Sequence, residues 1–501
     1  MGIHSVVPRL RYRRQTADIY QDGRSGIPMA PGAVPVLGHA WRLGRDPMSF
    51  LDGIPRDADI VRVLLGPHPI ALVCDPELTQ QMLKDDRTFD KGGPLISIVS
   101  SLVGDGIVTC PRSRHRPSRR LVQPDFRPDR YRSYARKTIV ATSAITRDWR
   151  NGQAIDVPVE LRRIAIHASV KYLFSDQINT AQVDQMAEDF TTIQIGFAKR
   201  MQMPPFLSHL PTPLNRAHDA AIKRTREVIT STVLARRANP GDQRQDLLST
   251  LLTNGTDDKP MLEESVLEDH VATFLIASTA TVSSVLGWAL HHLAQDPQLQ
   301  HRLHHELDSV LNGSPAGFDD LPQLGLTRAI VTEATRMYPS LWLGPARVTT
   351  ADTQLGDHFL PAGTEMAYSP YVHHRRDELY DDPHTFDPDR WTDDRPPHPA
   401  HHASVAYGGG ARQCIAVEWA PIEMALTLAT IASRWALESV PGRPLRSCAA
   451  PNLTARGLQV RVSTRTRGNR ANAAASTTLA SMAVRSGPGT RRPTNRATWL
   501  I

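Results

Sequence analysis

The chain has few cysteines, and they form no recognisable pairs. Of its 501 residues only four are cysteine, and they stand at positions 74, 110, 414 and 448. None of these spacings is typical of a metal-binding or redox pair, which argues against a disulfide framework. We therefore expect a reducing, cytoplasmic environment.

The N-terminus lacks a long apolar run. Residues 1–26 are polar and basic, with neither the apolar core of a signal peptide nor a stretch long enough to span a bilayer. A proline-rich segment begins at Ile27. From this pattern we expect no membrane anchor.

Acidic residues are missing from the C-terminus. From Arg465 onward there is none, and the arginines there account for the whole net charge of +7: Arg465, Arg467, Arg470, Arg485, Arg491, Arg492 and Arg496. The rest of the chain is close to neutral. We predict a disordered basic tail over residues 463–501 and no nucleic-acid partner.

No linker divides the middle of the chain, although its length alone would suit about three domains. Helical periodicity over residues 217–237, 262–294 and 297–311 predicts helices, and residues 58–74 alternate as a β-hairpin would. The sequence therefore predicts a single domain over residues 27–462, mainly helical with a smaller strand-rich lobe.

The most informative segment runs from Tyr407 to Ala416, where Cys414 follows three glycines and Arg412. The glycines let the backbone lie against a flat macrocycle and aim amide N–H groups at the sulfur. Arg412 and the N-terminus of a helix predicted over 417–428 favour a thiolate, which on haem iron promotes cleavage of O₂. We interpret Cys414 as the iron ligand; the alternative is an inert cysteine beside a glycine turn.

This segment resembles the cytochrome P450 signature, Phe-Gly-x-Gly-x-Arg-x-Cys-x-Gly. Tyr407 takes the aromatic position, Gly408 is the first glycine, and Ala416 replaces the last one. The resemblance extends over about residues 27–462. It implies the mainly α P450 fold with a small β-rich lobe, haem b (iron protoporphyrin IX) as cofactor, and monooxygenase activity.

Two further motifs stand in the order of that family. Glu333 and Arg336 are three residues apart and so share one helix face, like the family's Glu-x-x-Arg. Phe386 to Trp391 resembles the segment whose arginine, here Arg390, completes a network with that pair. A carboxylate between two guanidinium groups predicts a structural brace under the haem.

The two haem propionates require cations. The resemblance implies that His115 and Arg119, together with Arg347 and Arg412, bind them. The alternative for the basic run at 112–120 is a solvated surface.

The segment around Phe274 to Thr281 departs from the family pattern. Alignment places Ser278 at the usual glycine, Ala280 at the usual acid and Thr281 at the alcohol. Thr281 is therefore the candidate catalytic residue for proton delivery, because a hydroxyl both donates and accepts. The alternative is a set of small packing residues bonded to preceding carbonyls.

The regions that line the pocket by resemblance are mostly apolar, which predicts an apolar substrate. We expect it to be contacted by Leu95, Phe274, Ala277, Leu341 and Trp342. The segments near Phe89 and Pro31 are similar to those of bacterial family members that oxidise sesquiterpenes. A terpene of bacterial secondary metabolism is therefore expected.

No flavin or nicotinamide module is evident in the sequence. By analogy with bacterial family members, electrons for O₂ activation would come from a ferredoxin and its reductase. The loss of the acid at Ala280 leaves a peroxygenase, isomerase or dehydratase open. A non-catalytic protein that binds haem or a hydrophobic ligand is the other alternative.

Overall fold

The computed structural model describes residues 26–66, 68–202, 210–239, 244–253, 263–392, 404–441, 446–449 and 452–465. The last described strand, β12 (Gln459–Thr464), passes the predicted domain boundary at residue 462. Arg465 then donates hydrogen bonds to the carbonyls of Ala432 (3.0 Å) and Ser433 (3.2 Å). The folded domain therefore includes residues 463–465, and the remainder of the predicted tail lies outside the described residues.

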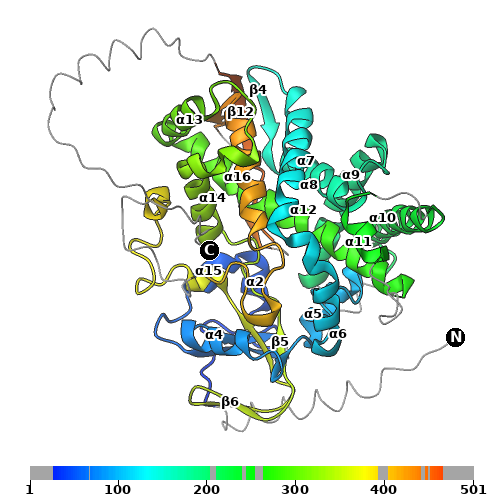
Figure 1. Cartoon of the computed structure of the whole chain (residues 1–501). Helices are drawn as coiled ribbons and strands as arrows, with labels where there is room; N and C mark the ends of the chain where they lie inside the picture. The colour runs from blue at the N-terminus through cyan, green and yellow to red at the C-terminus, as the bar shows by residue number, and fades with distance from the viewer. Residues whose placement is uncertain are drawn as a thin grey trace, which may run out of the picture.

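Helices form most of the described chain (Figure 1). They are α2 (Ala40–Arg45), α3 (Pro47–Asp52), α4 (Pro76–Lys84), α5 (Gly93–Val103), α6 (Arg112–Val122), α7 (Pro128–Arg147), α8 (Val157–Phe174), α9 (Thr180–Gln202), α10 (Pro213–Arg237), α11 (Leu247–Thr253), α12 (Glu264–Gln295), α13 (Pro297–Leu311), α14 (Gly325–Met337), α15 (Pro370–His373) and α16 (Trp419–Ala432). The three predicted helices correspond to α10, α12 and α13.

The central helix is α12, which is apolar around most of its circumference and is therefore buried. Its residues Ser265–Gln295 are long and apolar enough to cross a membrane, but 78% of the most apolar stretch is buried inside the fold. Val285 and Leu286 of α12 share a core with Leu161 of α8 and Leu426 of α16. That burial is typical of a core helix.

The strands form small sheets. The largest has the order β1-β2-β8-β5-β3, and its first two strands pair antiparallel, which confirms the predicted hairpin. The strands are β1 (Ile60–Leu65), β2 (His68–Val73), β3 (Phe89–Asp90), β4 (Gln153–Asp156), β5 (Arg347–Thr349), β6 (Thr353–Leu355), β7 (His358–Leu360), β8 (Glu365–Tyr368), β9 (Trp435–Ser439), β10 (Arg446–Ala449), β11 (Leu453–Arg456) and β12. In Figure 1, β5 and β6 lie at the opposite end of the molecule from β4 and β12.

Candidate active site

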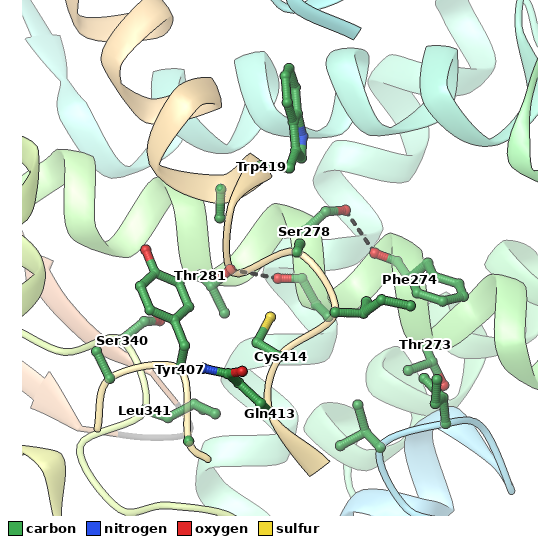
Figure 2. Close-up of a pocket in the computed structure, with 18 of the residues that line it drawn as sticks. Thr273, Phe274, Ser278, Thr281, Ser340, Leu341, Tyr407, Gln413, Cys414 and Trp419 are labelled. Carbon is green, nitrogen blue, oxygen red and sulfur yellow. Dashed lines mark hydrogen bonds between the residues drawn. The ribbon is translucent and has the colours of Figure 1, made fainter. Parts of the chain in front are cut away.

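A cavity of about 280 Å³ lies between α12 and the loop that carries Cys414. Figure 2 shows the Cys414 sulfur pointing toward Thr281 and Ser278 of α12. The lining is mainly apolar: Ile107, Val108, Phe126, Leu173, Leu247, Phe274, Ala277, Val282, Val285 and Leu341 all contribute. The Cys414 sulfur therefore borders a mainly apolar cavity.

The glycine loop has the backbone that its sequence predicts. Gly408 and Gly410 have φ angles of +71° and +62°, which side chains rarely adopt. A Cβ on Gly410 would lie only 2.2 Å from the Leu83 carbonyl oxygen, so a side chain is also excluded by space. The Cys414 amide donates to the Tyr407 carbonyl (2.9 Å), which closes the loop.

The Cys414 sulfur faces the cavity rather than bulk water. Burial raises the pKa of its thiol, while the amide of Ala416 and the guanidinium of Arg119 act in the opposite direction. Arg412 does not have the role we predicted beside the sulfur. Its guanidinium is held by Asp90 (2.7 Å) and by the Cys110 carbonyl (2.8 Å), and Arg119 is the cation that lowers the pKa of Cys414.

Five basic side chains line one end of the cavity: Lys91, His115, Arg119, Arg347 and Arg412. Arg347 is only 2% exposed, and its Nη1 donates to the Phe89 carbonyl (3.2 Å). Within the described residues its Nε has no hydrogen-bond partner, and neither does Nε of Arg412 or Nδ1 of His115. Buried donors of this kind indicate a missing acceptor.

Lys91 is the functional candidate that the sequence reasoning missed. Its ammonium makes one long hydrogen bond, to the Pro345 carbonyl (3.4 Å). Burial and the nearby charges of Arg347 and Arg412 hold the pKa of Lys91 well below its usual range. The adjacent Asp90 carboxylate is already bound by Arg412, so this group of cations has an excess of positive charge. A ligand with two carboxylates would neutralise it.

The predicted brace residues come together in the core. Glu333 is fully buried, and its two carboxylate oxygens accept from Arg336 Nη2 (2.7 Å) and Nε (2.8 Å). Arg390 Nε lies 3.3 Å from the same carboxylate, and Trp391 Nε1 donates to it at 2.8 Å. Arg336 in turn donates to the His374 carbonyl (2.8 Å), so the carboxylate links α14 to the following loops.

Thr281 and Ser278 both line the cavity from α12. The Thr281 hydroxyl donates to the Ala277 carbonyl (2.7 Å), and the Ser278 hydroxyl to the Phe274 carbonyl (2.7 Å), as Figure 2 shows. Ser278 also lies 2.7 Å from the Ser169 hydroxyl of α8. Ala280 is buried on the core side of the helix, so the usual acid has no replacement at this position.

Three of the five expected substrate contacts line the cavity, namely Phe274, Ala277 and Leu341. Leu95 and Trp342 instead pack in a separate cluster that contains Tyr371. Trp342 follows Leu341 in a segment outside the helices and strands, and neighbouring side chains there point in different directions. Leu95 lies in the first turn of α5, and its amide donates to Glu365 (3.1 Å).

Comparison with known proteins shows which protein family has this fold and site. The family model for Cytochrome P450 matches residues 28–457. The chain is 38% identical over 443 residues to pentalenene oxygenase from Streptomyces avermitilis, covering 88% of this chain and 98% of that one. It is also 38% identical to cyclooctat-9-en-7-ol 5-monooxygenase from Streptomyces melanosporofaciens, covering 83% and 90%.

A solved structure has the same fold. The haem domain of cytochrome P450DA superposes with a TM-score of 0.77 at 23% identity, over 88% of this chain and 98% of that chain. The site is that of a haem-dependent monooxygenase. The chain belongs to the cytochrome P450 family, whose members use haem iron, O₂, a hydrophobic substrate and electrons from redox partners.

Proposed function

We propose that this monooxygenase inserts one atom of O₂ into a terpene of bacterial secondary metabolism. The observation that carries this proposal is the apolar chamber directly above the Cys414 sulfur. The names of the two relatives from Streptomyces, pentalenene oxygenase and cyclooctat-9-en-7-ol 5-monooxygenase, support the substrate class. Hydrocarbon rings would fill the chamber by displacing water from its apolar walls.

We infer that the cofactor is haem b with Cys414 as the iron ligand. When bound, thiolate-ligated haem activates O₂ for insertion into a C–H bond. Tyr407 and Gly408 shape the loop around the sulfur. The propionates would be held by the basic side chains that line the cavity: Lys91, His115, Arg119, Arg347 and Arg412.

Thr281 is the residue that we assign to proton delivery. Its hydroxyl faces the cavity and donates to the Ala277 carbonyl, so its oxygen can accept a hydrogen bond from water. Since Ala280 supplies no acid, ordered water beside Thr281 would carry the proton. The brace of Glu333, Arg336 and Arg390 would hold the fold beneath the haem and take no part in the chemistry.

A ferredoxin with its reductase is the electron donor that we propose, in the cytoplasm. Arg114, Arg116 and Arg120 are exposed on α6, the helix that also carries Arg119. Arg119 donates to the Gln413 carbonyl, next to Cys414. An acidic partner would therefore dock close to the sulfur side of the cavity.

Turnover of cyclic terpenes tests this function. The haem-loaded protein should form an oxygenated product with O₂, reduced nicotinamide, ferredoxin and reductase. Turnover with hydrogen peroxide alone would favour the peroxygenase alternative, which the absence of an acid at Ala280 keeps open. Terpene binding without turnover in either system would favour the non-catalytic alternative.

A further inference from the structure

The serine and threonine hydroxyls in the cavity differ in whether their protons already have a hydrogen-bond acceptor in the protein. Six such residues line it: Ser169, Thr273, Ser278, Thr281, Thr335 and Ser340. The first five lie in helices, and each donates to the carbonyl four residues earlier at 2.7–2.8 Å. A hydroxyl whose proton is engaged in this way can accept a hydrogen bond from a ligand but cannot readily donate one.

Ser340 is different because it lies beyond the end of α14 at Met337, and among the described residues its hydroxyl makes no bond to a helical carbonyl. Its oxygen accepts a hydrogen bond from Nδ2 of Asn452 at 2.8 Å. Within the described part of the chain, the Ser340 hydroxyl proton has no acceptor. This proton is therefore available for a ligand in the cavity.

The position of Ser340 is fixed by strand β11. The Leu453 amide donates to the Ser340 carbonyl at 2.9 Å. The Leu453 carbonyl in turn accepts from Ser284 Oγ (2.6 Å) and Trp288 Nε1 (2.9 Å) of α12. Figure 2 shows Ser340 beside Leu341, on the opposite side of the view from Phe274. Ser340 is thus a pre-positioned hydrogen-bond donor in a mostly apolar wall.

We propose that Ser340 is a specificity-determining residue that donates a hydrogen bond to an oxygen atom already present in the substrate. The inference rests on the proposed terpene function and narrows it to terpenoid alcohols, ethers or carbonyl compounds. A pure hydrocarbon would bury the Ser340 donor without a partner, which costs binding free energy. The substrate would then come from a reaction that adds oxygen to a terpene skeleton, by hydration or by an earlier oxidation.

Equilibrium dialysis of the haem-loaded protein against matched terpenes tests the proposal. The probes are cedrene with cedrol and farnesene with farnesol, each quantified by gas chromatography. Wild type should bind the alcohol of a pair more tightly than the hydrocarbon. Ser340→Ala should reduce this preference about 5-fold, as expected for one lost hydrogen bond. Ser340→Thr keeps the hydroxyl and should retain the preference.

Thr192→Val is the matched control, because it removes a helical hydroxyl that donates to the Glu188 carbonyl and does not line the cavity. It should leave the ratio of the two dissociation constants unchanged. Equal binding of alcohol and hydrocarbon by wild type, or a preference that survives Ser340→Ala, would overturn the role of Ser340. Wild type that binds none of the four compounds would overturn the terpene function itself, and this inference with it.

Discussion

The hydroxyl of Ser169 on α8 lies 2.7 Å from the hydroxyl of Ser278 on α12. Both oxygens also contact the carbonyl four residues earlier in their own helix, so three short contacts share two hydroxyl protons. Ser278 occupies the position where the family usually has glycine. This contact joins the two helices beside the cavity and indicates a packing role for Ser278.

Replacement of Ser278 by alanine should affect stability alone. We expect Ser278→Ala to lower the free energy of unfolding by about 1 kcal/mol, the usual net value of one hydrogen bond. The yield of product per reduced nicotinamide consumed should stay at the wild-type level. Urea denaturation and coupled turnover measure the two quantities, and a fall in yield would give Ser278 a part in proton delivery.

Thr281→Ala should instead affect turnover. Loss of the hydroxyl leaves the cavity without its assigned proton-delivery group, and acid–base assistance is typically worth about 10²- to 10⁴-fold. We expect less product per reduced nicotinamide consumed and more hydrogen peroxide released, with haem content unchanged. Identical yields in Thr281→Ala and wild type would reduce Thr281 to a packing residue.

Cys414→Ala should abolish the red-shifted absorption that thiolate-ligated haem gives with carbon monoxide after reduction. Cys74→Ala and Cys110→Ala are the controls, because both thiols are buried, and burial raises the pKa of Cys74 to about 12. Cys448→Ala should also retain the band. Survival of the band in Cys414→Ala would assign the iron to another ligand.

Glu333→Ala should prevent folding or haem retention. Removing the carboxylate leaves Arg336 and Arg390 buried without their shared counter-charge, typically a loss of about 3–5 kcal/mol. Asp319→Ala is the control, since its ion pair with Arg132 is exposed, and the unfolding midpoint should not move. Thermal unfolding and haem absorbance report both outcomes; a haem-loaded Glu333→Ala protein of normal stability would contradict the brace.

Lys91→Met should have opposite effects on the two forms of the protein. The haem-loaded form should release haem faster to apomyoglobin, because one propionate partner is gone. Lys84→Met is the control: it changes an exposed lysine and should leave the rate of haem release unchanged. The haem-free form should become more stable, since burial and the charges of Arg347 and Arg412 both disfavour the Lys91 ammonium. Slower haem release from Lys91→Met would contradict the assignment.

The depressed pKa of Lys91 also predicts a pH dependence. The unfolded chain binds a proton at this side chain up to about pH 10.4, while the folded haem-free chain loses it at lower pH. Stability of the haem-free form should therefore rise with pH in this interval. Urea midpoints at pH 7 and pH 9 should show a smaller rise in Lys91→Met than in wild type.

Contiguous motifs made much of the fold and site predictable. The Cys414 loop could be identified because its glycines, whose backbone angles are unusual, are adjacent in the sequence. Glu333 and Arg336 share one turn of a helix, and only Arg390 had to be brought from elsewhere. In both places the chemistry is mostly encoded within about ten residues.

The errors arose where distant segments compete for a side chain. Arg412 pairs with Asp90, which is 322 residues earlier, and so does not serve the sulfur as we predicted. Lys91 looks like an ordinary loop lysine until the surrounding fold buries it. Leu95 and Trp342 were assigned to the cavity by segment alone. Trp342 lies outside regular structure, where the direction of a side chain cannot be derived from its neighbours in sequence, and Leu95 packs into the other cluster from the first turn of α5.

The cations beside the cavity also bear on how the protein is made in the cell. Burial of Lys91 beside Arg347 and Arg412 is unfavourable while the chain folds without haem, because the three like charges repel one another. The two propionates of a bound haem would neutralise this charge. We therefore expect overexpression without added haem precursor to accumulate incompletely assembled chains.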